Sequence, residues 1–561
     1  MAADPAPFDS ASFSIFHFPL YISLVLQRLR ERLTLLLIAL LPLHALLVTV
    51  GTKLIEGSGH APMAVLAVWK EGILGIILVL AVMGLLMNAK RALLCFDAAD
   101  VLIVALILLS FVVTYLTHQD WKLAALGFKY DFLPLTAFLI LRRVPWSGDF
   151  LRSARTVLLW IGAAVAAYGL ATLVLPRGFF LWLGYGDAHS LYFPDQPLAS
   201  FQLIAETGIR RIQSTFSGPN QFGLWLLLPL SVLLSLVSQT RERSKEKLSA
   251  RQSPSARPCA SSSTPPGIRG RLVDNAASQQ GLPLHPQWRA DPPHGWLFPS
   301  RVVISLIVLI LFALFFSFSR SAWIGGAVML LVTLHAALPR RIFWRSFAAL
   351  MLAGVIVAAA GIALSPKVLG RLSSSRGHLT RPLEAVHMII AHPFGLGLGT
   401  AGPASNRVSE TCVMLRPQDD PAWAKSQPTL CVFLGDTQVQ PADHICRCPF
   451  HPENWYLQVG VELGILGFVL FILLMITVLR RLGMQNAKCK MQNDIHSHFS
   501  FYISHFTFLA FLAVSIAALF LHAWEDSAIA YTLWMLIASS CPPAFSAPAH
   551  GHRFRCPDLP D

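Results

Sequence analysis

Four short segments of this chain carry the arginines, carboxylate and histidines from which a phosphate-handling site could be built. They contain Arg210 and Arg211 in RRIQSTFSGPNQFG, Arg320 in FSFSRSAW, Arg376, His378 and Arg381 in SSSRGHLTRPLEA, and His451, Glu453 and Asn454 in HPENWYLQVGVELGILG. Planar guanidinium groups bind phosphate oxygens bidentately and stay charged at physiological pH. A carboxylate or imidazole beside them is suited to accept a proton from an attacking hydroxyl. These residue types predict transfer of a group from a lipid pyrophosphate, with arginines stabilising the leaving group in place of a metal.

The composition places the chain in a membrane. Of its 561 residues, 54% are hydrophobic and 13% are charged, and the mean hydropathy is +0.57, whereas about a quarter of the residues of a soluble chain are charged. Soluble enzymes and nucleic-acid binders are therefore excluded as first interpretations. The net charge of +14 fits membrane topology better than nucleic-acid binding, because Lys and Arg fall in short clusters between apolar blocks. Single arginines at a membrane rim also commonly snorkel toward lipid headgroups.

Twelve continuous apolar blocks predict an all-α polytopic membrane protein rather than a transmembrane barrel. They lie near 33–50, 63–87, 101–117, 123–141, 154–175, 219–238, 302–319, 321–338, 343–364, 455–479, 499–522 and 527–541. Clusters of Lys and Arg recur at every second connection, as at Lys90 and Arg91. Both termini are therefore expected to be cytoplasmic. We expect the first block to be a membrane anchor and not a cleaved signal peptide.

The order of the blocks divides the chain into five regions. These are membrane helices over 1–238, a disordered cytoplasmic loop over 239–301, three membrane helices over 302–364, an extracytoplasmic loop over 365–454, and three membrane helices with a C-terminal tail over 455–561. The disorder is expected because 239–301 is rich in Ser, Pro, Arg and Gly and has no apolar period.

Four of the nine cysteines fall in the long outer loop, at Cys412, Cys431, Cys446 and Cys448. An oxidising compartment favours disulfides between them. The alternative, a metal pair at Cys446 and Cys448, has a one-residue gap that departs from the usual zinc spacings. We expect no metal site, and disulfides that do not join Cys446 to Cys448. Two pairings satisfy that condition, and the sequence does not choose between them.

Several polar residues in or beside the blocks have structural interpretations that weigh more than functional ones. Lys129 and Asp131 could form a proton or substrate relay, but residues two apart do not share a helix face, so we expect each to meet a different helix. Glu462 is expected to accept a hydrogen bond. Glu525 and Asp526 are expected to be solvated caps at the start of the last helix.

Taken together, RIQSTFSGPNQFG, FSFSRSAWIGG, GHLTRPLEAVHMIIAHPFGLGLGT and ENWYLQVGVELGILG resemble the O-antigen ligase and O-antigen polymerase superfamily of bacterial envelope glycosyltransferases. The resemblance spans roughly residues 205–480 and depends on the order and spacing of the motifs. It implies a protein of the bacterial cytoplasmic membrane that moves an undecaprenyl-pyrophosphate-linked glycan to an acceptor hydroxyl at the outer face. It also implies that the reaction needs no metal or other cofactor. The acceptor could be a lipid, a glycan or a protein.

The resemblance assigns roles to individual residues. It places Arg211, Arg320 and Arg381 on the pyrophosphate, matches Pro219 and Asn220 to a Pro-Asn pair at a helix start, and matches Gly395, Gly397 and Gly399 to a glycine run. Asn454 and Arg376 are further candidates to support the substrate site.

Two positions depart from the family pattern. Where the family has His before Asn, this sequence has Glu453, and His451 lies two residues earlier. Either Glu453 serves as the base or a shift of the loop lets His451 do so, and we favour Glu453. Position 214 is Ser where the family tends to have Gly.

Two other classes of function compete with a glycosyltransferase, whether ligase or polymerase. A transporter or flippase of an envelope polymer or lipid-linked glycan would place substrate groups near the bilayer midplane, on broken helices of repeated halves. Here the charged residues gather toward one face, and the sequence shows no repeat, so the enzyme is favoured. A catalytically inactive scaffold is the third hypothesis, and the change at Glu453 is the reason to retain it.

Overall fold

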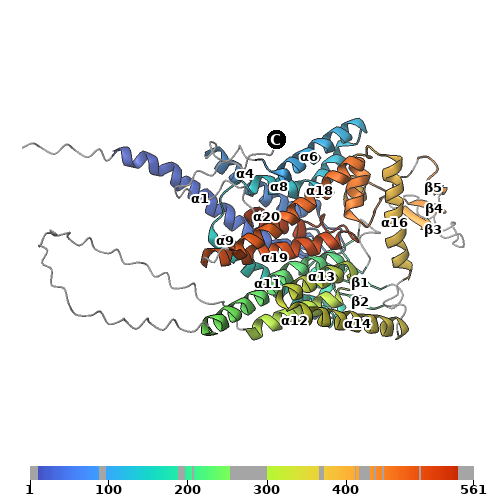
Figure 1. Cartoon of the computed structure of the whole chain (residues 1–561). Coiled ribbons are helices and arrows are strands. Elements are labelled where there is room, and N and C mark those ends of the chain that lie inside the picture. The colour runs from blue at the N-terminus through green and yellow to red at the C-terminus, as the bar shows by residue number, and fades with distance from the viewer. Residues whose placement is uncertain are drawn as a thin grey trace, which may run out of the picture.

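The computed structural model is a bundle of helices with two small sheets at one end (Figure 1). It describes residues 11–540 with gaps at 88–95, 188–195, 205–207, 253–299, 365–371, 411, 416–429, 435–436, 445, 447 and 492–494. The first helices are α1 (Ala11–Leu40), α2 (His44–Glu56), α3 (Ala64–Ala67), α4 (Trp69–Met87), α6 (Ala98–Leu116), α7 (Trp121–Asp131), α8 (Leu133–Leu141), α9 (Gly148–Ala171) and α10 (Arg177–Leu183). The others are α11 (Pro219–Gln252), α12 (Ser300–Phe316), α13 (Arg320–Ala337), α14 (Arg340–Leu364), α16 (Leu372–Ala391), α17 (Gly402–Asn406), α18 (Trp455–Met491), α19 (Ile495–Ala517) and α20 (Ser527–Ser540).

Every one of the twelve predicted apolar blocks falls on a helix or a consecutive pair of helices. Among the described residues, seven helices are long and apolar enough to cross a membrane, or eight if the bent pair α7 and α8 forms one span. Three shorter apolar helices accompany them, at Arg301–Phe316, His505–Ala517 and Ser527–Ser540. The protein is thus mostly helical with membrane-spanning helices, as predicted, and the number of twelve spans stays a prediction.

Helices α11 and α20 form the centre of the bundle. Every residue from Ala528 to Ser539 is buried, and the side chains of Trp225, Leu226 and Leu227 in α11 have no exposed surface. A helix that is apolar on all sides lies in the core of a large protein or within a membrane, and the burial of these side chains places α11 and α20 inside the bundle. The outer helices expose large apolar side chains instead, such as Leu108 and Phe111 of α6, as expected where lipid covers the surface.

Arg142 lies at the centre of a buried ion-pair network at the junction of α6 and α8. Its guanidinium has no exposed surface and lies 2.9 Å from Asp100 Oδ1. It also contacts Asp97, while Arg143 lies 2.9 Å from the other carboxylate oxygen of Asp100. From the sequence these arginines appear only as part of a cationic loop. Their burial and pairing give them a structural role, because a buried guanidinium is stable only when it is paired.

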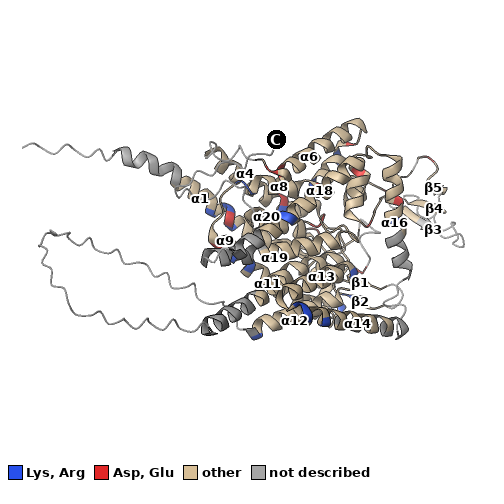
Figure 2. Ribbon diagram, in the orientation of Figure 1, with Lys and Arg blue, Asp and Glu red and all other residues tan. Residues whose placement is uncertain are grey.

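The two sheets lie at the same end of the bundle as α16, on the right in Figure 1. Strands β1 (Gln202–Leu203) and β2 (Arg210–Arg211) pair antiparallel. Strand β4 (Cys431–Leu434) pairs in parallel with β3 (Cys412–Leu415) and antiparallel with β5 (Thr437–Gln440). The predicted loop over 365–454 therefore contains a helix of 20 residues and a small sheet. Figure 2 shows how sparse charged residues are along the described helices.

Two disulfides hold the three-stranded sheet. One joins Cys412 to Cys448 and the other joins Cys431 to Cys446. This is one of the two pairings that the sequence left open, and it confirms that Cys446 and Cys448 are not joined to each other. Helix α11 continues to Gln252, and the remainder of the predicted cytoplasmic loop, 253–299, lies outside the described residues.

Candidate active site around helices α13, α16 and α18

Arg211 is fixed between the start of α11 and the turn that precedes α13. Its Nη2 donates to Asn220 Oδ1 at 2.8 Å and to the Phe318 carbonyl at 3.3 Å. Its Nε donates to the Ser317 carbonyl at 3.2 Å, and the neighbouring Ile212 amide donates to the Phe316 carbonyl. The structure thus joins two predicted site residues, Arg211 and Asn220, directly. The same turn leads within two residues to a third, Arg320.

Arg320 is the first residue of α13 and is partly buried. Close packing of α13 on α19 sets its position, because a Cβ atom on Gly325 would lie only 2.8 Å from the Ala513 carbonyl oxygen. At the end of α19, the Ala518 carbonyl accepts a hydrogen bond from the amide of Trp455, the first residue of α18. The N-termini of α13 and α18 therefore flank the same end of α19.

Arg381 and Glu453 form an ion pair across two elements. Arg381 Nη1 of α16 lies 2.7 Å from Glu453 Oε1, and the two side chains are 47% and 19% exposed. The backbone of Glu453 has a φ of 52°, a left-handed conformation that costs a residue other than glycine about 1 kcal/mol or more. Arg376 also lies in α16, but its side chain is outside the described part of the structure.

Asn454 caps helix α18. Its Oδ1 accepts from the Leu457 amide at 3.1 Å, and its Nδ2 donates to the Leu519 carbonyl at 3.0 Å. One polar atom of the side chain thus caps α18, and the other joins the start of α18 to the residues that follow α19. This cap fixes the segment that carries Glu453 and His451, and the predicted support of a substrate site by Asn454 stays a prediction.

His451 is held in one orientation close to the ion pair. Its Nε2 lies 2.7 Å from Asn406 Oδ1 of α17, a contact that favours the tautomer with the proton on Nε2 and the lone pair on Nδ1. Burial, reinforced by the charge of Arg381, lowers the pKa of His451 to about 4. The imidazole is therefore neutral at physiological pH and able to accept a proton.

A buried chain of hydrogen bonds, which the sequence did not reveal, lies behind His451. The ring of His522 is 5.5 Å from that of His451, and its Nδ1 lies 2.8 Å from Gln458 Oε1. The amide of Gln458 in turn donates to Glu525. Burial raises the pKa of Glu525 well above its usual value and lowers that of His522 to about 3. Two segments that are more than 60 residues apart contribute these residues, so no local motif could have indicated the chain.

The predictions for the last two carboxylates differ in outcome. Asp526 Oδ1 accepts from the amides of Ala528 and Ile529, so this residue caps α20 as expected. Glu525 was expected to be solvated, and that expectation is wrong, because the residue is only 7% exposed. Its contact with Gln458 turns it inward.

The glycine run docks against a break in α18. Gly395, Gly397 and Gly399 have φ values of 87°, 104° and 82°. The Gly397 amide donates to the Glu462 carbonyl at 3.0 Å, and the Ile465 amide to the Pro393 carbonyl at 3.0 Å. The break occurs at Gly464, whose φ is 71°. The glycines are required here for conformation and close approach of two backbones, which is a structural role.

Lys129 and Asp131 meet different helices, as predicted. Lys129 Nζ lies 2.9 Å from Glu71 of α4, whereas Asp131 forms a hydrogen bond with Glu462 of α18. Glu462 Oε1 also accepts from the Ala401 amide at 3.2 Å, so its predicted role as an acceptor is confirmed.

The backbone of Ser214 has the left-handed conformation that fits the glycine of the family pattern at this position. Its φ of 53° lies in the region that favours glycine. The hydroxyl donates to the Val165 carbonyl at 2.7 Å. This hydrogen bond offsets part of the free-energy cost of the left-handed backbone.

Comparison with known proteins adds no assignment: no family model matches this chain, and no curated protein matches it significantly. Functional inference therefore depends on the geometry above and on the motifs themselves.

Proposed function

We propose that this protein is a membrane glycosyltransferase of the O-antigen ligase or polymerase type. It would move a glycan from an undecaprenyl-pyrophosphate-type lipid to an acceptor hydroxyl at the outer face of the bacterial cytoplasmic membrane. The observation that carries the proposal is the contact between Arg381 and Glu453 at 2.7 Å. It joins a candidate pyrophosphate ligand to a candidate base beside the N-terminus of a spanning helix.

The proposed reaction is a single displacement at the anomeric carbon of the donor sugar. Glu453 accepts the proton of the acceptor hydroxyl, and the acceptor oxygen forms a bond to that carbon. The bond from the carbon to the pyrophosphate oxygen breaks, and the electron pair leaves with the lipid pyrophosphate. Arg211, Arg320 and Arg381 stabilise the charge that develops on the leaving group. The atoms and electrons of this step balance without a cofactor.

Two features support Glu453 as the base, and two support His451. Glu453 is held in a strained backbone conformation, which is common at functional sites, and Arg381 orients its carboxylate. An adjacent cation weakens a carboxylate as a base, whereas partial burial strengthens it. His451 has the lone pair on Nδ1 and the neutral ring described above. We retain Glu453 as the proposed base and His451 as the alternative.

The proposed topology has twelve spans, with both termini in the cytoplasm. The periodic recurrence of Lys and Arg between the apolar blocks supports it. The disulfides of the sheet support an oxidising outer compartment for the segment between α14 and α18. The partners in this scheme are the pyrophosphate-linked donor, a hydroxyl-bearing acceptor and the surrounding lipids.

A transporter is the second candidate, and one observation favours it. Helix α18 is broken at Gly464, and α7 and α8 meet at a bend of 50°. Buried Glu462 and Asp131 lie close to these two breaks and contact each other. Broken spans that carry ionisable groups are typical of ion-coupled transporters. Arg211, Arg320 and Arg381 have no obvious task in such a mechanism, and for this reason the enzyme stays first.

Reconstitution of the purified protein would decide between them. In liposomes supplied with an undecaprenyl-pyrophosphate-linked oligosaccharide and candidate acceptors, the enzyme should release free lipid pyrophosphate and form a sugar–acceptor bond. A transporter should move the intact donor across the bilayer without cleaving it. Each assay is run beside a Glu453→Gln control. Movement of the intact donor across the bilayer without cleavage would overturn the proposal.

A further inference from the structure

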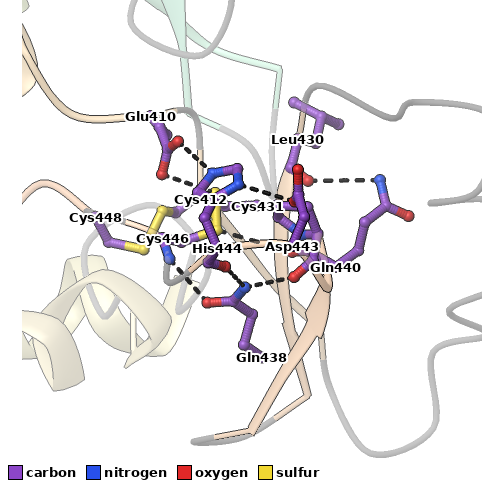
Figure 3. The surroundings of a disulfide bond; sticks show 11 residues. Glu410, Cys412, Leu430, Cys431, Gln438, Gln440, Asp443, His444, Cys446 and Cys448 are labelled. Carbon is purple, nitrogen blue, oxygen red and sulfur yellow. Dashed lines mark hydrogen bonds and ion pairs between the residues drawn. A yellow bond between two sulfur atoms is a disulfide. The ribbon is translucent and has the colours of Figure 1, made fainter.

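A second constellation of reactive side chains lies in the disulfide-linked sheet, away from the helix ends described above. Glu410, Cys431, His444 and Cys446 come from three segments around β3, β4 and β5 (Figure 3). Each offers one ligand atom, and these atoms all lie within 4.8 Å of one another. Two thiolates, an imidazole and a carboxylate are the ligands that Zn²⁺ takes most often.

The present distances are close to those of a zinc site. His444 Nε2 lies 2.7 Å from Glu410 Oε1, and Glu410 Oε2 lies 3.2 Å from Cys431 Sγ. A sulfur in a disulfide carries no hydrogen, so this second approach is a contact and not a hydrogen bond. In tetrahedral zinc sites with bonds of about 2.0 to 2.3 Å, neighbouring ligand atoms are about 3.3 to 3.8 Å apart. The two sulfur atoms are the pair that must separate most, and they separate once their bond is cleaved.

The histidine has the orientation that metal-binding imidazoles require. Asp443 Oδ1 lies 2.9 Å from His444 Nδ1, on the side of the ring opposite to Glu410. A carboxylate on the distal nitrogen is the usual partner of a metal-bound histidine, because it fixes the tautomer and directs the other nitrogen at the metal. Gln438 fixes the backbone nearby, accepting from the Cys446 amide at 2.9 Å and donating to the His444 carbonyl at 2.7 Å.

We propose that reduction of the Cys431–Cys446 disulfide converts this cluster into a Zn²⁺ site with Cys431, Cys446, His444 and Glu410 as ligands. A dithiol reductant transfers two electrons and two protons to the disulfide and is itself oxidised to a disulfide. The two thiols then bind Zn²⁺ as thiolates and release two protons. The pairing of β3 with β4 and of β4 with β5 can keep the strands in register when both disulfides are reduced. The cluster would thus exchange a covalent crosslink for a metal crosslink. This inference does not depend on the proposed glycosyltransferase activity.

Zinc binding by the purified full-length protein tests the proposal. Protein reduced with a phosphine, which does not compete as a dithiol chelator, is titrated with Zn²⁺ against a chromophoric chelator, and thiols are counted in parallel. The reduced protein should bind one Zn²⁺ more than reduced Cys431→Ser/Cys446→Ser. The matched pair Cys412→Ser/Cys448→Ser should retain that zinc. Co²⁺ in place of Zn²⁺ should give the ligand-field spectrum of a tetrahedral thiolate site.

Single variants identify the remaining ligands. His444→Ala and Glu410→Ala should each weaken zinc binding by more than Asp443→Ala does, and Asp443→Ala by about 10- to 100-fold. Thr437→Ala, on the exposed side of β5, is the matched control and should change nothing. Equal zinc affinity for His444→Ala, Glu410→Ala and the parent would overturn the proposal. So would equal zinc binding by reduced Cys431→Ser/Cys446→Ser and the parent. These comparisons do not require the Cys412→Ser/Cys448→Ser pair to fold.

Discussion

Arg381 Nη1 and Glu453 Oε1 lie 2.7 Å apart and join α16 to the turn before α18. The contact keeps the carboxylate beside His451, whose pKa reflects both charges. It also means that Arg381, a candidate ligand of the anion, and Glu453, a candidate base, are in direct contact. A bound pyrophosphate would compete for the same guanidinium, so donor binding and release of the base would be coupled.

Glu453→Gln should abolish most transfer while leaving donor binding intact. The substitution keeps the shape of the side chain and removes its basicity, and general-base assistance is worth about 100- to 10,000-fold. Turnover and donor affinity are measured separately in reconstituted protein. His451→Ala is the comparison and should reduce transfer less than Glu453→Gln does. Glu453→His should retain part of the activity that Glu453→Gln loses. Full turnover in Glu453→Gln combined with its loss in His451→Ala would identify His451 as the base.

Arg320→Lys should be nearly as harmful as Arg320→Ala, and the same should hold for Arg211. An ammonium cannot reproduce the planar fork by which Arg211 reaches Asn220, Ser317 and Phe318. Loss of a charge-assisted contact of roughly 2 to 4 kcal/mol slows transfer about a hundredfold or more. Thermal unfolding of each variant separates loss of structure from loss of chemistry. Near-parental turnover for both alanine variants would remove the arginines from the proposed site.

Acidification should reduce the stability of the folded protein, because the pKa of His451 is lowered to about 4. Because the folded-state pKa lies below the unfolded value of about 6.5, stability contributed by the neutral ring is present above that value and is lost as pH falls toward 4. Arg381→Gln removes a cation and should raise the pKa of His451. Histidine NMR of selectively labelled protein measures both effects. An unchanged pKa in Arg381→Gln would contradict the electrostatic part of this account.

Glu525 should make the protein less stable at high pH. Burial raises its folded-state pKa well above 4.5, so its contribution is present below the unfolded pKa and is lost as pH rises through the folded one. Glu525→Gln stays neutral and can still accept from Gln458, so its melting temperature should depend less on pH. Glu525→Ala leaves Gln458 without its acceptor and should destabilise by about 1 to 3 kcal/mol. Identical pH slopes for the parent and Glu525→Gln would refute the assignment.

Cysteine labelling tests the topology. In intact cells, a cysteine at Ser409 should react with an impermeant reagent, and one at Ser261 should not. Ser261 lies outside the described residues, but its place in the predicted cytoplasmic loop makes it a suitable reporter. The opposite pattern would mean that the bundle is inverted, and it would place the arginines on the cytoplasmic face.

The sequence by itself determined the features that local chemistry controls. Continuous apolar blocks predicted the helices, because backbone groups in lipid must be satisfied within each segment. The apolar blocks that were predicted to begin near 219, 321 and 455 correspond to helices that start at Pro219, Arg320 and Trp455. Cysteine spacing also excluded one disulfide pairing, since Cys446 and Cys448 are separated by a single residue.

Tertiary structure decided what depends on distant segments. The contact of Arg211 with the turn at Phe318 joins residues 107 positions apart, and the one between Gln458 and Glu525 spans 67. A sequence pattern carries no information on which helix ends meet. The inward turn of Glu525 and the docking of the glycine run on α18 both follow from packing, in which buried polar groups must find partners wherever the fold supplies them.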